Sequence, residues 1–124
     1  MSELFEGLGG RYRRAQVYFE MRDYLTAAGE LEAVLVELPE NVAARLLLAR
    51  AYYHSARLVL AEDTIREVID RAPTDAYAYL VLGRVLQRQG RHDEAVGPLR
   101  LAAAMNPDLA ADQAAAAGDD QPQR

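Results

Sequence analysis

Small residues and prolines recur along this chain at one fixed interval, and this interval is the strongest constraint on its fold. Three kinds of position return every 34 residues: a small residue, an alanine and a proline. These positions are Ala15, Ala49 and Gly83; Ala27, Ala61 and Ala95; and Pro39, Pro73 and Pro107. Self-similarity at a period of about 20 to 50 residues is typical of a solenoid. One structural unit therefore runs three times through almost the whole chain.

Each unit reads as two helices joined by a short turn. Apolar residues recur at helical spacing from Arg11 in the first unit, and again from about Val42 in the second. A proline closes each second helix, because proline neither donates to the helix ladder nor fits its interior. The predicted N-caps are Asp23, Asn41 and Asp75. We expect an all-α chain of six helices packed as antiparallel neighbours, with the small residues where helices cross closely.

Composition excludes several classes of function. The 124 residues, 51% of them hydrophobic, predict one folded domain, and no apolar run is long enough to span a membrane. A net charge of −5 argues against a nucleic-acid partner. The absence of cysteine excludes disulfides and thiol chemistry. An acidic N-terminus without a long apolar core predicts no secretory signal, and so a cytoplasmic protein. Arginine as the only basic residue, beside histidine, is typical of a GC-rich bacterial genome.

No cluster of residues has the spacing of a catalytic or metal site. The histidines, His54 and His92, lack a second ligand at metal-binding spacing. Glu30 and Glu32 lie on a predicted solvated face, whereas general acid–base catalysis needs carboxylates held across a cleft. The glycine-rich run at residues 7–10 lacks the strand and the lysine of a phosphate-binding loop. We therefore expect no enzymatic activity, no cofactor and no metal.

The repeated positions resemble the tetratricopeptide repeat family, whose period is also 34 residues. Beyond the small residues and prolines, the match includes an aromatic position and two apolar positions in the second helix. These are Tyr18, Tyr52 and Leu86; Leu31, Ile65 and Leu99; and Val34, Val68 and Ala102. The resemblance covers about Leu8 to Pro107. It implies a right-handed α-solenoid of three helix-turn-helix hairpins with a short C-terminal capping helix.

The resemblance also divides the chain into segments. A lead-in at 1–7 precedes a repeat domain at 8–117, and a tail at 118–124 is predicted to be disordered. The repeats and the capping helix are expected at about 8–41, 42–75, 76–109 and 108–117. Because Leu109 is the main apolar residue of an alanine-rich cap, we expect this helix to cover the last repeat only weakly.

Three positions depart from the family pattern. The early aromatic position reads Arg11, Arg45 and Tyr79, and the turn glycine reads Arg22, Ala56 and Gly90. Arg14 stands where the later units have leucine. A terminal repeat exposes one face to water, which accounts for Arg14.

In the family, five positions of each unit face a concave groove. Carried onto this chain, they are Gly9, Tyr12, Gln16, Phe19 and Glu20; Ala43, Leu46, Arg50, Tyr53 and His54; and Tyr77, Leu80, Arg84, Gln87 and Arg88. Tyrosine and arginine dominate binding hot spots. The resemblance therefore implies an adaptor whose groove binds a peptide or partner protein. We expect aromatic side chains to bury area, and arginines to pair with acidic side chains or a C-terminal carboxylate.

Two alternatives to the peptide-binding groove stay open. In the first, Phe19 and Leu46 pack between units and the arginines are solvated. In the second, the chain is a self-associating structural module that forms a homodimer through its terminal hairpin or its exposed groove. One family function is set aside, because the lysine and asparagine clamp with which some members hold chaperone tails is absent. The corresponding positions are Tyr12, Gln16, Leu47, Tyr77 and Val81.

Overall fold

A computed structural model describes residues 2–110 of the chain, with side chains from residue 7 onward. Its helices are α1 (Ser2–Glu20), α2 (Tyr24–Glu37), α3 (Val42–His54), α4 (Leu58–Arg71), α5 (Ala76–Arg88) and α6 (His92–Met105). Residues 108–110 are also helical. No strand occurs between residues 2 and 110, and the expected all-α class is confirmed.

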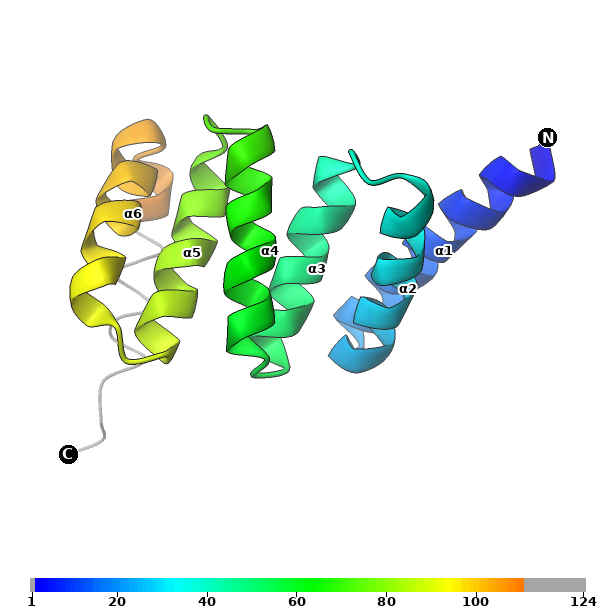
Figure 1. The fold of residues 1–124 in the computed structure, drawn as a ribbon, viewed down its shortest axis with the longest axis horizontal. Coiled ribbons are helices and arrows are strands. Elements are labelled where there is room, and N and C mark those ends of the chain that lie inside the picture. The colour runs from blue at the N-terminus through cyan, green and yellow to red at the C-terminus, as the bar shows by residue number, and fades with distance from the viewer. Residues whose placement is uncertain (1, 111–124) are drawn as a thin grey trace.

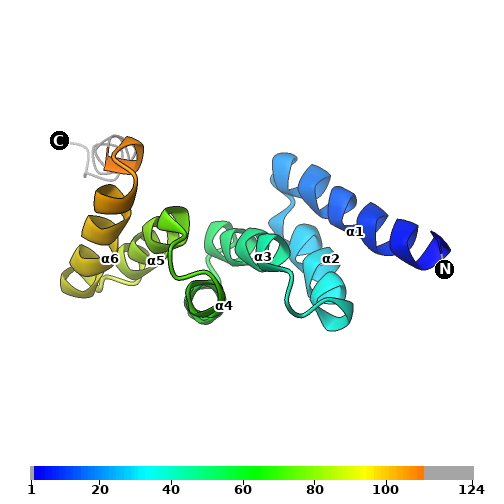
Figure 2. The ribbon, with the colours of Figure 1, turned by 90° about the horizontal axis from the view of Figure 1, so that it is seen from above.

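Successive helices run antiparallel and pack side by side (Figure 1). Helices α1 and α2, α3 and α4, and α5 and α6 form three hairpins, and the contacts of α2 with α3 and of α4 with α5 stack them. Seen from above, α1, α3 and α5 line the inner side of a curve, with α2 and α4 on its outer side (Figure 2). The architecture is the expected right-handed α-solenoid.

The small residues that repeat along the sequence lie at helix crossings. Ala15, Ala49 and Ala61 are fully buried. A Cβ added at Gly83 would stand 2.3 Å from Leu99 Cδ2, so a larger residue fits there only if Leu99 moves. The largest fully buried side chains fill the space between these crossings and are Leu31, Val34, Ile65, Val68, Val85 and Leu86. Close approach and large fillers together make the continuous core of the stack.

Short polar side chains start three helices, as predicted. Asp23, Asn41 and Asp75 each accept hydrogen bonds of 3.1–3.3 Å from backbone N–H groups in the following turn. These bonds satisfy donors that the first turn of a helix leaves unpaired. Arg57 and Arg91 occupy the equivalent position before α4 and α6 and make no such side-chain bond. The second helices of units two and three therefore begin without a side-chain cap.

The three hairpin turns share one backbone conformation although their residues differ. The angle φ is 64° at Arg22, 62° at Ala56 and 78° at Gly90. This left-handed region costs a residue with a Cβ roughly 1–2 kcal/mol, whereas glycine adopts it freely. The first two units therefore keep the turn geometry of the third at an energetic cost.

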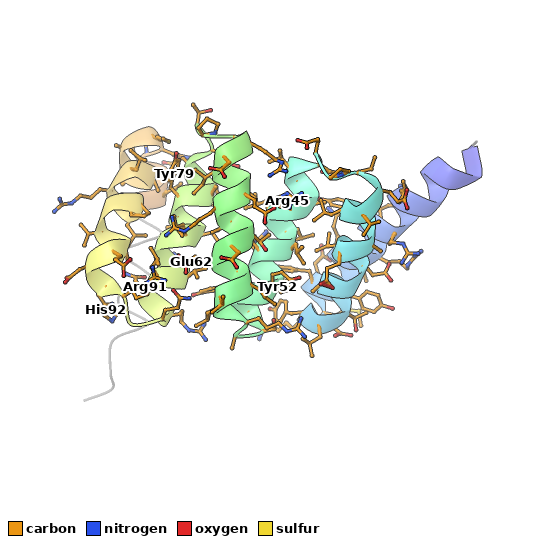
Figure 3. The ribbon with its side chains drawn as sticks, viewed as in Figure 1. Arg45, Tyr52, Glu62, Tyr79, Arg91 and His92 are labelled. Carbon is orange, nitrogen blue, oxygen red and sulfur yellow. The ribbon has the colours of Figure 1, made fainter. Side chains whose placement is uncertain are left out.

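In the second unit, Arg45 stands where the family has an aromatic residue, yet it makes the same contact as Tyr79 in the third unit. An Arg45 Nη donates to the carbonyl of Pro39, and the Tyr79 hydroxyl donates to the carbonyl of Pro73 at 2.8 Å (Figure 3). Each bond ties a first helix to the proline that closes the preceding unit. Arginine and tyrosine are interchangeable here because both are long donors.

The N-terminal end differs from expectation in its extent. Helix α1 begins at Ser2, whereas the helical pattern was expected from Arg11. Glycines weaken a helix by about 1 kcal/mol each but do not terminate it, and no proline interrupts this stretch. Arg14 is exposed and pairs with Glu30 at 3.3 Å, as suits an end face in contact with water.

The C-terminal end is described only to residue 110. Leu109 is buried and packs in one cluster with Leu80 and Ala102. Most of the predicted capping helix, and the whole predicted tail at 118–124, lie outside the described residues.

Candidate functional site

A hollow of about 420 Å³ opens on the inner side of the curve, between α1 and α3. Its lining comprises Tyr12, Gln16, Phe19, Glu20, Ala43, Leu46, Leu47 and Arg50. All but Leu47 belong to the predicted groove positions. The other predicted positions of the first two units, Gly9, Tyr53 and His54, do not line it.

Aromatic rings and arginines form a continuous chain of contacts that starts in this hollow and crosses all three units. We call it the aromatic–arginine ladder, and its members are Phe19, Tyr24, Arg50, Tyr53, His54, Tyr77 and Arg88. Phe19 meets Tyr24 edge-on at 5.1 Å and His54 edge-on at 5.6 Å between ring centroids. Tyr24 and His54 are stacked at 4.8 Å, and Tyr53 meets His54 at 5.2 Å.

Two arginines extend the ladder toward the third unit. The Arg50 guanidinium lies over the Phe19 ring at 4.8 Å and over the Tyr77 ring at 5.5 Å. The Arg88 guanidinium lies over Tyr53 at 5.2 Å. Such cation–π contacts contribute about 0.5–1 kcal/mol each at exposed sites. They also hold two otherwise flexible side chains in defined positions.

Four rings of the ladder also pack on the core. Phe19, Tyr24, Tyr53 and Tyr77 are half-buried, with one side against buried residues of the main hydrophobic cluster. Packing between units and lining of the inner face are therefore not alternatives for Phe19, which does both. The arginines are likewise not merely solvated, because they stack on rings.

The electrostatics of the ladder are unbalanced toward positive charge. Within residues 7–110, Arg50 and Arg88 form no salt bridge, and neither does Arg22 in the nearby turn. Glu20 borders the hollow without pairing to Arg50. Burial and then the charges of the three arginines lower the pKa of His54 below its usual 6.5. His54 is therefore a neutral ring at pH 7, surrounded by cations.

In the third unit, the predicted groove residues lie in different surroundings. Leu80 is only 3% exposed beneath Leu109, so its prediction as a lining residue is wrong: the segment after α6 covers it. Arg84 and Gln87 are half-buried on α5 but belong neither to the hollow nor to the ladder. Sequence reasoning missed Tyr24 and Arg22, because both lie outside the first helices on which the family register places its groove.

Other kinds of site find no support in the described part of the chain. The side chains of residues 7–110 include no group of three histidines, aspartates or glutamates placed to hold a metal ion. Among these residues, no helix is both long and apolar enough to cross a membrane.

The repeat geometry and the sequence register together define a helical repeat protein. The sequence matches the model of the tetratricopeptide repeat over residues 12–76 and again over 60–122. This chain therefore belongs to the tetratricopeptide repeat family. No curated protein matches it significantly.

Solved structures share the fold at low sequence identity. A crystal structure of MamA is 21% identical with a TM-score of 0.77, over 81% of this chain and 58% of that one. MamA from Desulfovibrio magneticus RS-1 is 23% identical with a TM-score of 0.74, over 79% of this chain and 55% of that one. The Arabidopsis OM64 TPR domain is 17% identical with a TM-score of 0.78, over 82% of this chain and 84% of that one. The chain thus spans little more than half of these MamA chains.

Proposed function

We propose that this chain is a protein-interaction module that binds an extended segment of a partner along its inner face. The tetratricopeptide fold supports such a module. The observation that supports this particular face is the aromatic–arginine ladder, which continues from the hollow between α1 and α3 to Arg88 on α5.

The ladder has the physical properties of a binding hot spot. Tyr53 and Tyr77 offer large apolar area, and the core behind them limits the entropy that binding would otherwise cost. The hollow beside Tyr12 and Leu46 has room for an apolar side chain of the partner. A bound segment would therefore bury area on surfaces that are already ordered.

Selection from a random peptide library tests this proposal. Peptides selected on the full chain are measured by calorimetry against Tyr53→Ala on the ladder and Val36→Ala on the outer side. Val36 is 77% exposed and belongs to neither the hollow nor the ladder, so it controls for the loss of apolar area. We expect Tyr53→Ala to weaken binding about tenfold or more, as a hot-spot residue does. Equal binding to wild type and Tyr53→Ala would refute the inner face as the site.

Self-association is the second candidate, because α6 leaves apolar side chains in water. Leu101 and Met105 are exposed on this helix and, four positions apart, share one of its faces. Exposed apolar side chains that share a face near one end of a stack offer a surface on which a second copy could pack. Sedimentation velocity over a concentration series tests it: a dimer that Leu101→Glu dissociates supports this role. A monomer at every concentration removes it.

A further inference from the structure

We propose that the partner segment is acidic, with carboxylates held separately by Arg50 and Arg88 across the second and third units. This inference rests on the proposed function, since it names the chemistry of the partner at the same face. It commits to side-chain carboxylates along an extended peptide.

Two aromatic rings lie close to the guanidinium of Arg50. Its guanidinium carbon lies over the rings of Phe19 and Tyr77, at 4.8 and 5.5 Å from their centroids, and these contacts favour one position of the side chain. The guanidinium carries a planar fork of N–H donors. Such a fork matches the two oxygens of a carboxylate. No acidic residue between residues 7 and 110 forms a salt bridge with it.

The glutamates that form salt bridges in the described residues pair with arginines outside the ladder. Six arginines in the described residues each have a glutamate within 4.0 Å: Arg11, Arg14, Arg45, Arg66, Arg71 and Arg91. The net charge of the whole chain is −5, so carboxylates are in excess over cations. Even so, no carboxylate of residues 7–110 pairs with Arg50 or Arg88. The inner face keeps a local positive charge on an acidic protein.

The register of the repeats shows where on the face that charge lies. One position reads Glu20, His54 and Arg88 in the three successive units, and its sign changes from negative to positive. Because Glu20 borders the hollow, acid in the partner is repelled from the first unit. The acidic part of the partner should therefore lie over α3 and α5, with an uncharged or basic part over α1.

Each of the two arginines suits one carboxylate. Arg50 lies over Phe19 and Tyr77 and Arg88 lies over Tyr53, and each guanidinium carries a planar fork of donors that matches two carboxylate oxygens. Burial and then the charges of both arginines lower the pKa of His54, and a carboxylate bound beside them would raise it.

Fluorescence anisotropy with two synthetic peptides tests the proposal on the full chain. The peptides share tyrosine and leucine residues and differ only in carrying either glutamate or glutamine, with both termini blocked. We expect the glutamate peptide to bind at least about tenfold tighter at low salt, with the difference shrinking as salt screens the charges. Blocked termini remove a C-terminal carboxylate as the source of binding.

Charge reversal locates the effect. Arg50→Glu and Arg88→Glu should each weaken the glutamate peptide about tenfold. Arg100→Glu is the matched control, because Arg100 is exposed on α6 and forms no salt bridge in the described residues. If Arg50→Glu misfolds, Arg50→Gln replaces it in this test, because glutamine removes the charge and retains part of the aliphatic stem. A rise in the His54 pKa on peptide binding, measured by NMR, is a second supporting readout.

The outcomes separate the two proposals. If the glutamine peptide, or a phosphoserine peptide, binds better and Tyr53→Ala abolishes that binding, the acidic preference is wrong while the inner face remains the site. If Arg100→Glu weakens binding as much as Arg88→Glu, the charge effect is non-specific and the preference is again wrong. If no peptide, selected or synthetic, depends on Tyr53, both proposals fail.

Discussion

The arginines around α4 pair with glutamates, whereas those on the aromatic–arginine ladder lie over aromatic rings. Glu62 of α4 accepts from Arg66 at 3.0 Å and from Arg91 at 2.7 Å, which links the second hairpin to the third (Figure 3). Glu67 similarly pairs with Arg45 and Arg71. We call these contacts the α4 ion-pair network. On the inner face, Arg50 and Arg88 meet rings instead of acids.

This difference separates stability from binding. In the network, the charge of each arginine is balanced by a glutamate of the fold itself. A cation stacked on a ring is held in place while its hydrogen-bond donors stay available. The network therefore stabilises the fold, and the ladder is the surface that we propose for recognition. Five substitutions or titrations test this division.

Removing the shared acid of the network should have the largest effect. The Glu62 side chain is 14% exposed and receives two charged hydrogen bonds, so Glu62→Ala should lower the free energy of unfolding by about 2 kcal/mol. Urea denaturation measures this loss, and binding of the glutamate peptide should not change. Arg88→Ala should show the reverse pattern. Loss of peptide affinity in Glu62→Ala, with the fold intact, would erase the distinction.

Tyr52 and Tyr53 are neighbours in sequence, but only Tyr53 belongs to the ladder. The Tyr52 hydroxyl donates to Glu32 at 2.8 Å, and burial together with that carboxylate raises the pKa of Tyr52 to about 12. Tyr52→Phe should therefore cost about 1–2 kcal/mol of stability at neutral pH. Tyr53→Phe, on the ladder, should cost much less.

The raised pKa also predicts an alkaline transition. The folded state favours the neutral phenol, so its stabilisation is complete below pH 10 and is lost as the pH rises from 10 to about 12. The chain contains no lysine to titrate in this window. Denaturation curves across the window should converge for wild type and Tyr52→Phe, and curves that stay parallel would contradict the shift.

The hairpin turns allow stability to be changed without touching either region. Ala56 has a φ of 62°, so Ala56→Gly should raise the free energy of unfolding by about 1 kcal/mol. Thermal denaturation measures the gain, with Gly90→Ala as the opposite control. Peptide affinity should remain constant in both, because neither residue belongs to the ladder. A destabilised Ala56→Gly would show that the turn is not strained.

The smallest expected effect is the pH response of His54. Burial and the charges of Arg50, Arg88 and Arg22 lower its pKa, so the folded state favours the neutral ring. The resulting stability is present above pH 6.5 and is lost as the pH falls below that value. NMR titration should find the His54 pKa below 6.5 and higher in Arg88→Gln. An unchanged His54 pKa in that variant would show that the charge of Arg88 does not act on His54.

Much of the site could be read from the repeat register. Tyr12, Phe19, Leu46 and Arg50 line one hollow, and their positions on the inner face follow from the period and the helix geometry. Leu80 shares a register position with Leu46 but is covered by Leu109, since the last unit has a different neighbour from the second. A register describes one unit and cannot report what packs on its end.

The ladder shows a second limit of sequence reasoning. Tyr24 follows a turn and starts an outer helix, yet its ring stacks on His54 from the next unit. Nothing in the local pattern indicates that contact, because it depends on how far one hairpin is rotated against the next. Arg45 is similar: its replacement of an aromatic residue makes sense only once the carbonyl of Pro39 is seen within its reach.

The sequence alone determined the helices, the turns, the small residues at the crossings and the solenoid that they build. These features repeat every 34 residues and depend on contacts within a unit or between equivalent units, so three copies of one pattern specify them. Only the tertiary structure decided which arginines meet glutamates and which meet rings. That choice depends on side chains brought together across different units, where each position has its own surroundings.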